Sequence, residues 1–245
     1  MKNFRIESVN GPFSFIHSNG FSHEKLPTIT MECPEDITYM RWGLVPFFTK
    51  TKEDKETLWK RGYTLNARGE EIFTKPSFRG PIKDKRCLIP ATGFFEWRNY
   101  NGIKYPYLVQ LINPDFEDDT TPFCFAGVYD RWVDKTTGEL IEGFAIVTTA
   151  ANSLMKRIHV NIDRPDEGGR QPVIVLPNDY ENWLSPNATF ENLERIIEPV
   201  QSEIIRAYTI TKDITRRGFD LTNPSLLSHV SYDNLPGCTF NIPNL

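Results

Sequence analysis

The chain has 245 residues, 39% of them hydrophobic and 13% aromatic, which is enough to bury the core of one large or two small domains. Its net charge of −4 argues against a protein coated with basic residues, although a local basic groove for nucleic acid is compatible with it. No apolar run reaches the length of a membrane span and none follows the N-terminal charges, so the sequence predicts neither a membrane span nor a signal peptide.

The cysteines lack the spacing of a metal site or of a disulfide framework. They are scattered along the chain at positions 33, 87, 124 and 238, without a CxxC pair. Such cysteines are typical of reduced thiols in a cytoplasmic protein. We therefore expect a cytoplasmic, monomeric protein without a metal or other cofactor.

The first aromatic segment of the chain covers residues 37–48. Its sequence, Ile-Thr-Tyr-Met-Arg-Trp-Gly-Leu-Val-Pro-Phe-Phe, predicts a strand that ends at Gly43, followed by an aromatic loop that Pro46 interrupts. These aromatic side chains either belong to the core or form a platform on which bases stack, because stacking on aromatic rings tolerates any base.

The next segment begins with charged, helix-competent residues 49–62, for which we expect Leu58 and Trp59 to face inward. Asn66 and Arg68 follow, two positions apart, so in a strand both side chains point to the same face. An amide beside a guanidinium suits an oriented phosphate or carbonyl group. The alternative is that Asn66 caps a helix that follows it.

Residues 86–97 carry the clearest chemical signal, an apolar strand followed by a turn at Thr92-Gly93 and then a carboxylate, Glu96. Because Glu96 stands between Phe95 and Trp97, we expect it to be partly desolvated, with a raised pKa that suits proton transfer. The alternative is a surface carboxylate at the end of a strand whose neighbours alternate into the core.

The second half of the chain alternates strand and helix signals. Strands are predicted over residues 104–111, 123–132, 143–149 and 170–177, and helical segments over residues 150–158, 179–184 and 189–206. The helix over residues 150–158 delivers His159 at its C-terminal end, where the helix dipole stabilises a protonated imidazole. A polar loop is predicted over residues 160–169, and a local basic patch near the strand signal of residues 208–211 contains Lys212, Arg216 and Arg217.

Motifs in this order resemble the SOS response-associated peptidase (SRAP) family, the abasic-site processing proteins. The motifs are Trp42-Gly43-Leu44-Val45-Pro46, Leu65-Asn66-Ala67-Arg68-Gly69-Glu70, residues 86–90 with Gly93-Phe94-Phe95-Glu96-Trp97, and Ile158-His159 followed by residues 170–177. The resemblance extends from residue 16 to residue 227. It implies an α+β fold in a single domain, with a β-barrel-like mixed sheet core and peripheral helices. Because we find no internal repeat and no linker, we predict one domain over residues 1–245, with a turn-rich, irregular tail over residues 228–245.

The resemblance also implies a function, which is the binding of single-stranded DNA that carries an abasic site. Family members expose a cysteine by autoproteolytic removal of the initiator methionine, and its amine and thiol condense with the sugar aldehyde into a thiazolidine, a cross-link with associated lyase activity. By motif, Asn66 would orient the reacting group, Glu96 would be the general acid/base, and His159 would assist opening and closing of the sugar. The DNA-binding residues implied are Arg68, Arg79 and Arg170 for the phosphates, with Trp42, Pro46 and Trp97 bordering the DNA.

Two features depart from the family pattern. The sequence begins Met1-Lys2 where the family has Met-Cys, and Cys33 is not a substitute because it has no free α-amine. We expect either that an N-terminal stretch is missing from this sequence or that the protein is a paralogue without the nucleophile. The second departure is the loop over residues 160–169, followed by Gln171 where the family favours Met; this loop lengthens one wall of the groove.

Two other classes of protein are compatible with the sequence. A module that binds single-stranded or abasic DNA without chemistry agrees with the absent cysteine, and a trapping assay separates it from an enzyme. A cysteine peptidase that uses Cys87 and His159 is disfavoured, because Cys87 lies in an apolar run and buried cysteines are usually inert.

Overall fold

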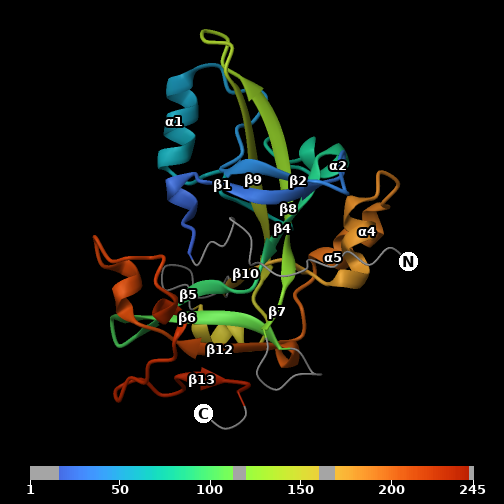
Figure 1. The fold of residues 1–245 in the computed structure, drawn as a ribbon. Helices are drawn as coiled ribbons and strands as arrows, with labels where there is room; N and C mark the ends of the chain where they lie inside the picture. Colours follow the sequence, from blue (N-terminus) through green and yellow to red (C-terminus); the bar gives the residue numbers. More distant parts are fainter. Residues whose placement is uncertain (1–16, 113–119, 160–168, 243–245) are drawn as a thin grey trace. The chain divides into compact units, whose positions relative to one another are not determined.

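The computed structural model describes residues 17–112, 120–159 and 169–242. The chain forms two compact units. The barrel unit comprises residues Asn19–Ala91 and Phe123–Ser202, and the sheet unit comprises Met1–Ser18, Thr92–Pro122 and Glu203–Leu245. Both are built on β-sheets, with short helices around them, and the predicted α+β class is confirmed (Figure 1). The extent of the predicted domain, residues 1–245, stays a prediction.

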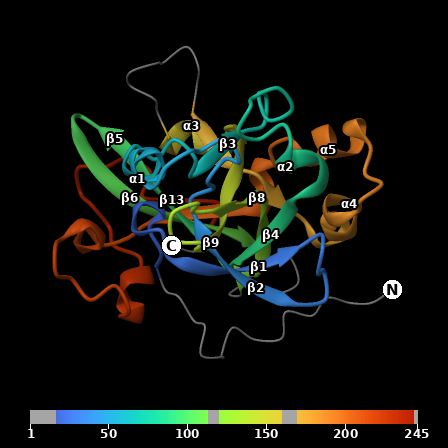
Figure 2. The ribbon, with the colours of Figure 1, turned by 90° about the horizontal axis from the view of Figure 1, so that it is seen from above.

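Five strands of the barrel unit close into a ring. β1 (Lys25–Thr30) pairs antiparallel with β2 (Ile37–Trp42) and β4 (Arg86–Ala91). β4 pairs with β8 (Phe123–Val133), and β8 pairs with β9 (Leu140–Ala150). A parallel pairing of β9 with β2 closes the ring, and β1, β2 and β4 lie side by side along one wall (Figure 2). The predicted barrel-like core is confirmed.

The helices of the barrel unit are short and pack on the outside of the barrel. They are α1 (Lys52–Lys60), α2 (Pro81–Asp84), α3 (Met155–Ile158), α4 (Tyr180–Leu184) and α5 (Phe190–Ile197). α1 begins with a reciprocal capping box between Thr51 and Asp54. Its Trp59 packs against the cluster of Val45, Trp132 and Ile141, so the predicted inward orientation of Trp59 is confirmed.

The predicted helix over residues 189–206 is wrong beyond Ile197. Glu198 adopts an extended conformation (φ −58°, ψ 147°) because the residue before a proline, here Pro199, is disfavoured in the helical region. The chain then forms a 3-10 turn over Ser202–Ile204 and enters a strand at Ile205.

The predicted helix over residues 150–158 is also shorter in the structure. β9 continues to Ala150, and only Met155–Ile158 are helical. Asn152 explains the delay, because its backbone N–H donates to the Gln171 side chain and its own side chain accepts from the Met155 N–H, both of which favour a turn.

Arg86 is a buried cation at the start of β4, with 1% of its surface exposed. Its guanidinium donates to the carbonyl oxygens of Ile82 (2.7 Å), Lys83 (2.7 Å), Trp183 (2.6 Å) and Ser185. These carbonyls lie at the C-terminal ends of α2 and α4, where partial negative charge accumulates. Arg86 therefore fastens two helices to the barrel wall through their exposed carbonyl groups.

The sheet unit is an antiparallel sheet in the order β13-β12-β6-β5. Its strands are β5 (Phe94–Tyr100), β6 (Ile103–Ile112), β12 (Ile205–Thr209) and β13 (Thr239–Phe240), and β7 (Thr120–Thr121) adds to β6. The predicted irregular tail over residues 228–245 therefore contains a paired strand. Among the residues that the structure describes, no helix combines the length and the apolarity needed to cross a membrane.

Candidate nucleic-acid interface

β3 (Asn66–Arg68) is a three-residue strand that runs parallel to the C-terminal part of β9. The register places Asn66 opposite Ile146 and Arg68 opposite Thr148. Ala67 is fully buried, whereas Asn66 is exposed and Arg68 is partly exposed. The prediction that Asn66 and Arg68 share one face is confirmed. Irregular turns follow Arg68 as far as residue 80, so Asn66 does not cap a regular helix.

The Trp42-to-Pro46 motif holds the segment that leads into β3. The Trp42 indole N–H donates to the Leu65 carbonyl (3.0 Å), and the Leu44 N–H donates to the Thr64 carbonyl (3.2 Å). Gly43 lies between them with φ +136°, a conformation that other residues resist, and a Cβ there would lie 2.6 Å from the His23 ring. The motif therefore sets the position of β3 on the barrel wall.

Gly69 directly follows β3 and lies close to the end of helix α5. Its N–H donates to the Thr148 carbonyl (2.8 Å), which extends the ladder with β9 by one step. A Cβ at position 69 would collide with the Ile197 side chain at the end of α5. The absence of a side chain therefore allows α5 to support β3 from behind.

Arg170 lies on β10 (Arg170–Pro172), which pairs antiparallel with β9 near the same place. Its guanidinium donates to both carboxylate oxygens of Glu70, at 3.0 and 2.8 Å, and to the carbonyl (2.8 Å) and hydroxyl (3.3 Å) of Thr148. Since Arg68 and Thr148 are register partners, the strand order β3-β9-β10 brings Asn66, Arg68, Thr148 and Arg170 to neighbouring positions. The motif prediction had not paired Arg170 with a carboxylate.

His159 is the partly exposed residue that caps α3, and its N–H donates to the Met155 carbonyl (2.7 Å). Gly169, directly before Arg170, packs on the His159 backbone so closely that a Cβ there would collide with the His159 carbonyl oxygen. The motif residues His159 and Arg170 are thus brought together. The helix behind His159 has only four residues, which limits the dipole effect expected from the sequence.

The aromatic residues of the 42–48 segment differ in exposure. Trp42 is partly buried and stacks on Phe144 with ring centroids 6.3 Å apart, and Pro46 is buried. The side chains that face solvent are Phe47 and Phe48, which are 68% and 46% exposed and meet edge to face. Sequence reasoning included them in an aromatic loop but not among the site residues. Their signal is two adjacent rings directly after a proline, where no alternation can bury both.

Arg79, another predicted phosphate ligand, is exposed in the turn before α2. The remaining departures from the family pattern fall outside the described residues. These are Lys2, the residue that follows Met1, and residues 160–168 of the predicted loop.

Glu96 and Trp97 belong to the sheet unit. On β5, Glu96 pairs with Tyr107, and its carboxylate accepts the Trp97 N–H at 2.8 Å. Phe95 and Trp97 pack together against the cluster of Leu108, Ile210, Ile214 and Leu226. Since side chains alternate along a strand, Glu96 lies on the opposite face of the sheet from those rings. Glu96 is itself partly buried, but the two rings that flank it in the sequence pack on the other face of the sheet.

Cys87 is fully buried in β4, and burial raises the pKa of its thiol far above the ordinary range. Burial likewise raises the pKa of Cys124 to about 12. A thiol that cannot ionise is a poor nucleophile, so the geometry disfavours a peptidase based on Cys87. Within the described part of the chain, no cluster of His, Cys, Asp and Glu residues could hold a metal ion.

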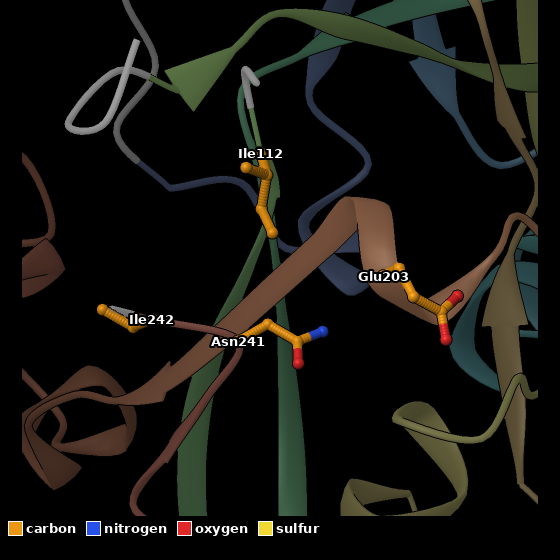
Figure 3. Close-up of a pocket in the computed structure, with 4 residues that line it drawn as sticks. All are labelled: Ile112, Glu203, Asn241 and Ile242. Carbon is orange, nitrogen blue, oxygen red and sulfur yellow. The ribbon is translucent and has the colours of Figure 1, made fainter. Parts of the chain in front are cut away.

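A hollow in the sheet unit lies apart from the predicted residues. It has a volume of about 450 Å³ and is lined by Ile112, Glu203, Asn241 and Ile242 (Figure 3). The Asn241 amide is held by the Ile205 carbonyl (2.8 Å). None of the residues predicted from the sequence lines it, so it is not the candidate interface.

A closed barrel that carries a polar edge strand, with the four motifs in order, defines the class of protein to which the chain belongs. It matches the family described as SOS response associated peptidase (SRAP) over residues 11–217 and is a member of that family, as its motifs predicted. Abasic site processing protein YoqW of Bacillus subtilis is 33% identical over 175 residues, which cover 70% of this chain and 68% of that protein. Abasic site processing protein HMCES of Gallus gallus is 32% identical over 159 residues, covering 59% and 44%.

Solved structures share this fold. A crystal structure of a protein from Bacteroides thetaiotaomicron is 36% identical, with a TM-score of 0.76 over 88% of this chain and 85% of that chain. A second, from Bordetella bronchiseptica, is 23% identical, with a TM-score of 0.63 over 77% of this chain and 85% of that chain. The latter similarity concerns the fold alone.

Proposed function

We propose that this protein binds single-stranded DNA that carries an abasic site, with Asn66 and Arg68 facing the DNA. The observation that carries the proposal is the placement of these two side chains together on the outward face of β3. A guanidinium binds a phosphate through paired N–H groups, and an adjacent amide orients a sugar oxygen or aldehyde. The relatives named as abasic site processing proteins support the same substrate class.

The charge of the protein sets how such binding would depend on salt. With a net charge of −4, the protein attracts DNA through local arginines and not through a basic coat. Binding through few phosphates gives a modest decrease of affinity with salt, because each neutralised phosphate releases about 0.7 counterion from single-stranded DNA. We therefore expect weak binding with a modest dependence on salt, to which Arg68 makes a measurable contribution.

The exposed pair Phe47 and Phe48 supplies the second kind of contact that single strands use. A base stacked on an aromatic ring contributes about 1–3 kcal/mol with little dependence on sequence. A lesion without a base leaves the neighbouring bases unstacked on one side, and exposed aromatic rings offer such bases a stacking surface. These rings therefore complement Arg68 in the proposal.

The chemical step of the proposal follows the family pattern. The amine of an N-terminal cysteine attacks the sugar aldehyde, the resulting carbinolamine loses water to give an imine, and the thiol closes the thiazolidine. Glu96 would protonate the departing hydroxyl and His159 would assist opening of the sugar. The alternative is binding without chemistry, which needs Arg68 and the aromatic pair but no cysteine.

Fluorescence anisotropy tests the binding step. The oligonucleotides are a labelled single strand with one abasic site, the same strand intact, and its duplex, each measured at several salt concentrations. Tighter binding of the abasic strand, reduced by Arg68→Ala but not by Arg195→Ala, is the expected result. Arg195 is an exposed arginine of the same unit paired with Asp179, so it controls for loss of charge. Equal affinities for the three oligonucleotides would overturn the proposal.

Denaturing electrophoresis tests the chemical step. An adduct with the abasic strand that survives heat and denaturant identifies a covalent cross-link. The assay is done on this chain and on a version in which cysteine replaces Lys2, since the family places its nucleophile directly after the initiator methionine. DNA binding in the anisotropy assay without an adduct in either version would show that these two versions bind and do not react.

A further inference from the structure

We propose that the carboxylate of Glu70 is a built-in substitute for a DNA phosphate, which an incoming strand must displace from Arg170. The inference rests on the proposed function, because it concerns the same face of β3, β9 and β10. It assigns to Glu70 the role of an internal competitor that lowers the affinity of the site for anions.

The hydrogen bonds of Arg170 fall into two groups. A guanidinium carries five N–H bonds, arranged as a fork that matches a carboxylate or a phosphate. Two of them, at 3.0 and 2.8 Å, engage the two oxygens of Glu70 in the side-by-side geometry that a phosphate also uses. Two others, at 2.8 and 3.3 Å, engage the carbonyl and hydroxyl oxygens of Thr148. The pair on Glu70 is thus the pair that a phosphate would need.

The two partners differ in how firmly they are held. The Arg170 side chain is 26% exposed and keeps its contacts to Thr148 on β9 if Glu70 leaves. The Glu70 side chain is 53% exposed and follows the end of β3 in an irregular turn. The carboxylate is therefore the partner that can swing into solvent, while the guanidinium remains in place to receive another anion.

Glu70 lies in the field of two arginines. Burial raises the pKa of Glu70, but hydrogen bonds from Arg170 and from its own backbone, with the charges of Arg170 and Arg68, outweigh burial and hold the pKa below its ordinary value. The carboxylate is therefore ionised near neutral pH, as a phosphate is. The charge of Arg68 also acts on Glu70, so a phosphate that took the place of this carboxylate would lie in the field of both arginines.

The displacement has a small free-energy cost. An exposed ion pair is worth at most about fivefold in an equilibrium constant, because solvent competes for both groups. A DNA phosphate that takes the same two N–H groups recovers that interaction and adds the release of counterions. Glu70 therefore weakens DNA binding by a few-fold without preventing it.

The test compares Glu70→Gln with Glu71→Gln. Glu71 is the adjacent exposed carboxylate, paired with Lys75 at 3.5 Å and not with Arg170, so its variant removes the same charge at nearly the same place. We expect Glu70→Gln to bind the abasic single strand about three- to fivefold more tightly than the wild type. Glu71→Gln should show a smaller gain, caused by net charge alone.

Glu70→Gln in an Arg170→Ala background shows whether the gain in DNA affinity depends on Arg170. The gain from Glu70→Gln should disappear there, while thermal melting verifies that every variant is folded. Equal gains for Glu70→Gln and Glu71→Gln, a gain that persists without Arg170, or a loss of affinity in Glu70→Gln would each overturn the proposal. A loss of affinity would assign Glu70 the opposite role, that of positioning Arg170 for the DNA.

A second readout separates this inference from the proposed function. Inorganic pyrophosphate should raise the melting temperature of Glu70→Gln more than that of the wild type, and not in the Arg170→Ala background. If pyrophosphate behaves so but no variant binds single-stranded DNA, the proposed function fails and the anion site stands. If DNA binds with a dependence on Arg68 but Glu70→Gln matches Glu71→Gln in both assays, the inference fails and the proposed function stands.

Discussion

The indole N–H of Trp42 donates to the carbonyl oxygen of Leu65 at 3.0 Å, one residue before β3 begins. This bond joins two family motifs that are 23 positions apart in the chain. It gives Trp42 a function in placing Asn66 and Arg68, in addition to the predicted role of bordering the DNA. The tryptophan can therefore affect DNA binding without a contact to the DNA.

Replacing Trp42 with Phe keeps an aromatic ring and removes this hydrogen bond. We expect a loss of about 1 kcal/mol in the free energy of unfolding, measured by urea denaturation, and weaker binding of single-stranded DNA. Trp183→Phe is the matched control, because the Trp183 indole donates a comparable bond (2.9 Å) to the Cys87 carbonyl on β4. Trp183→Phe should lose stability but, under conditions in which it is folded, should keep its affinity for single-stranded DNA. Equal affinities for the two variants would show that Trp42 does not act on β3.

Replacing Arg68 with Ala should weaken binding to single strands of any sequence. If Arg68 holds a phosphate, the slope of log affinity against log salt should fall by about 0.7 to 1. Anisotropy titrations at four or more salt concentrations measure the slope. An unchanged slope together with a lower melting temperature would identify Arg68 as a structural residue.

Glu96→Gln keeps the shape of the side chain and removes its ability to transfer a proton. In a protein that carries the N-terminal cysteine, we expect DNA affinity to be retained and cross-link formation or reversal to slow by at least about tenfold, since positioned acid/base groups contribute this much or more. Single-turnover rates of both steps are the measurement. If Glu96→Gln forms and reverses the cross-link at the same rates as its parent, Glu96 has no catalytic role.

Arg86→Met should destabilise the barrel unit strongly. The substitution leaves the carbonyl groups at the ends of α2 and α4 without their donor, and it removes the guanidinium from a site that holds it with 1% exposure. We expect a loss of about 3–5 kcal/mol in the free energy of unfolding, because several carbonyl groups lose their donor at about 1–3 kcal/mol for each one that stays buried. Arg98→Met is the control, since Arg98 lies in the other unit and donates at the surface to the Pro236 carbonyl. A loss below that of the control would contradict the fastening role of Arg86.

The thiols should react in an order set by burial. Cys33 is exposed, whereas Cys87 and Cys124 are buried in the barrel wall, where burial raises the pKa of Cys124 to about 12. A thiol-specific reagent at pH 8 should label Cys33 at once and the two buried cysteines only on unfolding. Mass spectrometry of the labelled peptides identifies the sites, and rapid labelling of Cys87 in the folded protein would contradict the structure.

Local patterns predict the parts of this protein that depend on neighbouring residues. The spacing of Asn66 and Arg68 predicts their common face, because alternation acts over two positions, and the composition of residues 123–132 predicts a strand. The aromatic neighbours of Glu96 follow the same rule. Phe95 and Trp97 point to the opposite face of the strand from Glu96 and pack into the core, as the alternative interpretation expected of these neighbours.

Contacts between distant residues are what the sequence could not provide. Glu70 and Arg170 are 100 positions apart, and the charge of either residue alone suggests an exposed group that is available to DNA. The depth of Pro46 depends on how the segment after β2 crosses the barrel wall, which no local pattern encodes. By contrast, a local pattern does indicate the early end of the helix at Ile197, because Pro199 disfavours a helical conformation of the residue before it.

Both units of the chain are assembled from separated pieces: residues Phe123–Ser202 complete the unit that Asn19–Ala91 begin, and Thr92–Pro122 lie between them in sequence. During synthesis, β1, β2 and β4 leave the ribosome before β8 and β9, so the outer edge of β4 stays open until β8 has been made and that of β2 until β9 has been made. Contacts that close such long loops slow folding, and open strand edges favour association with other chains. Expression of this protein should therefore depend on temperature and on chaperones, and a fragment ending before β9 should aggregate.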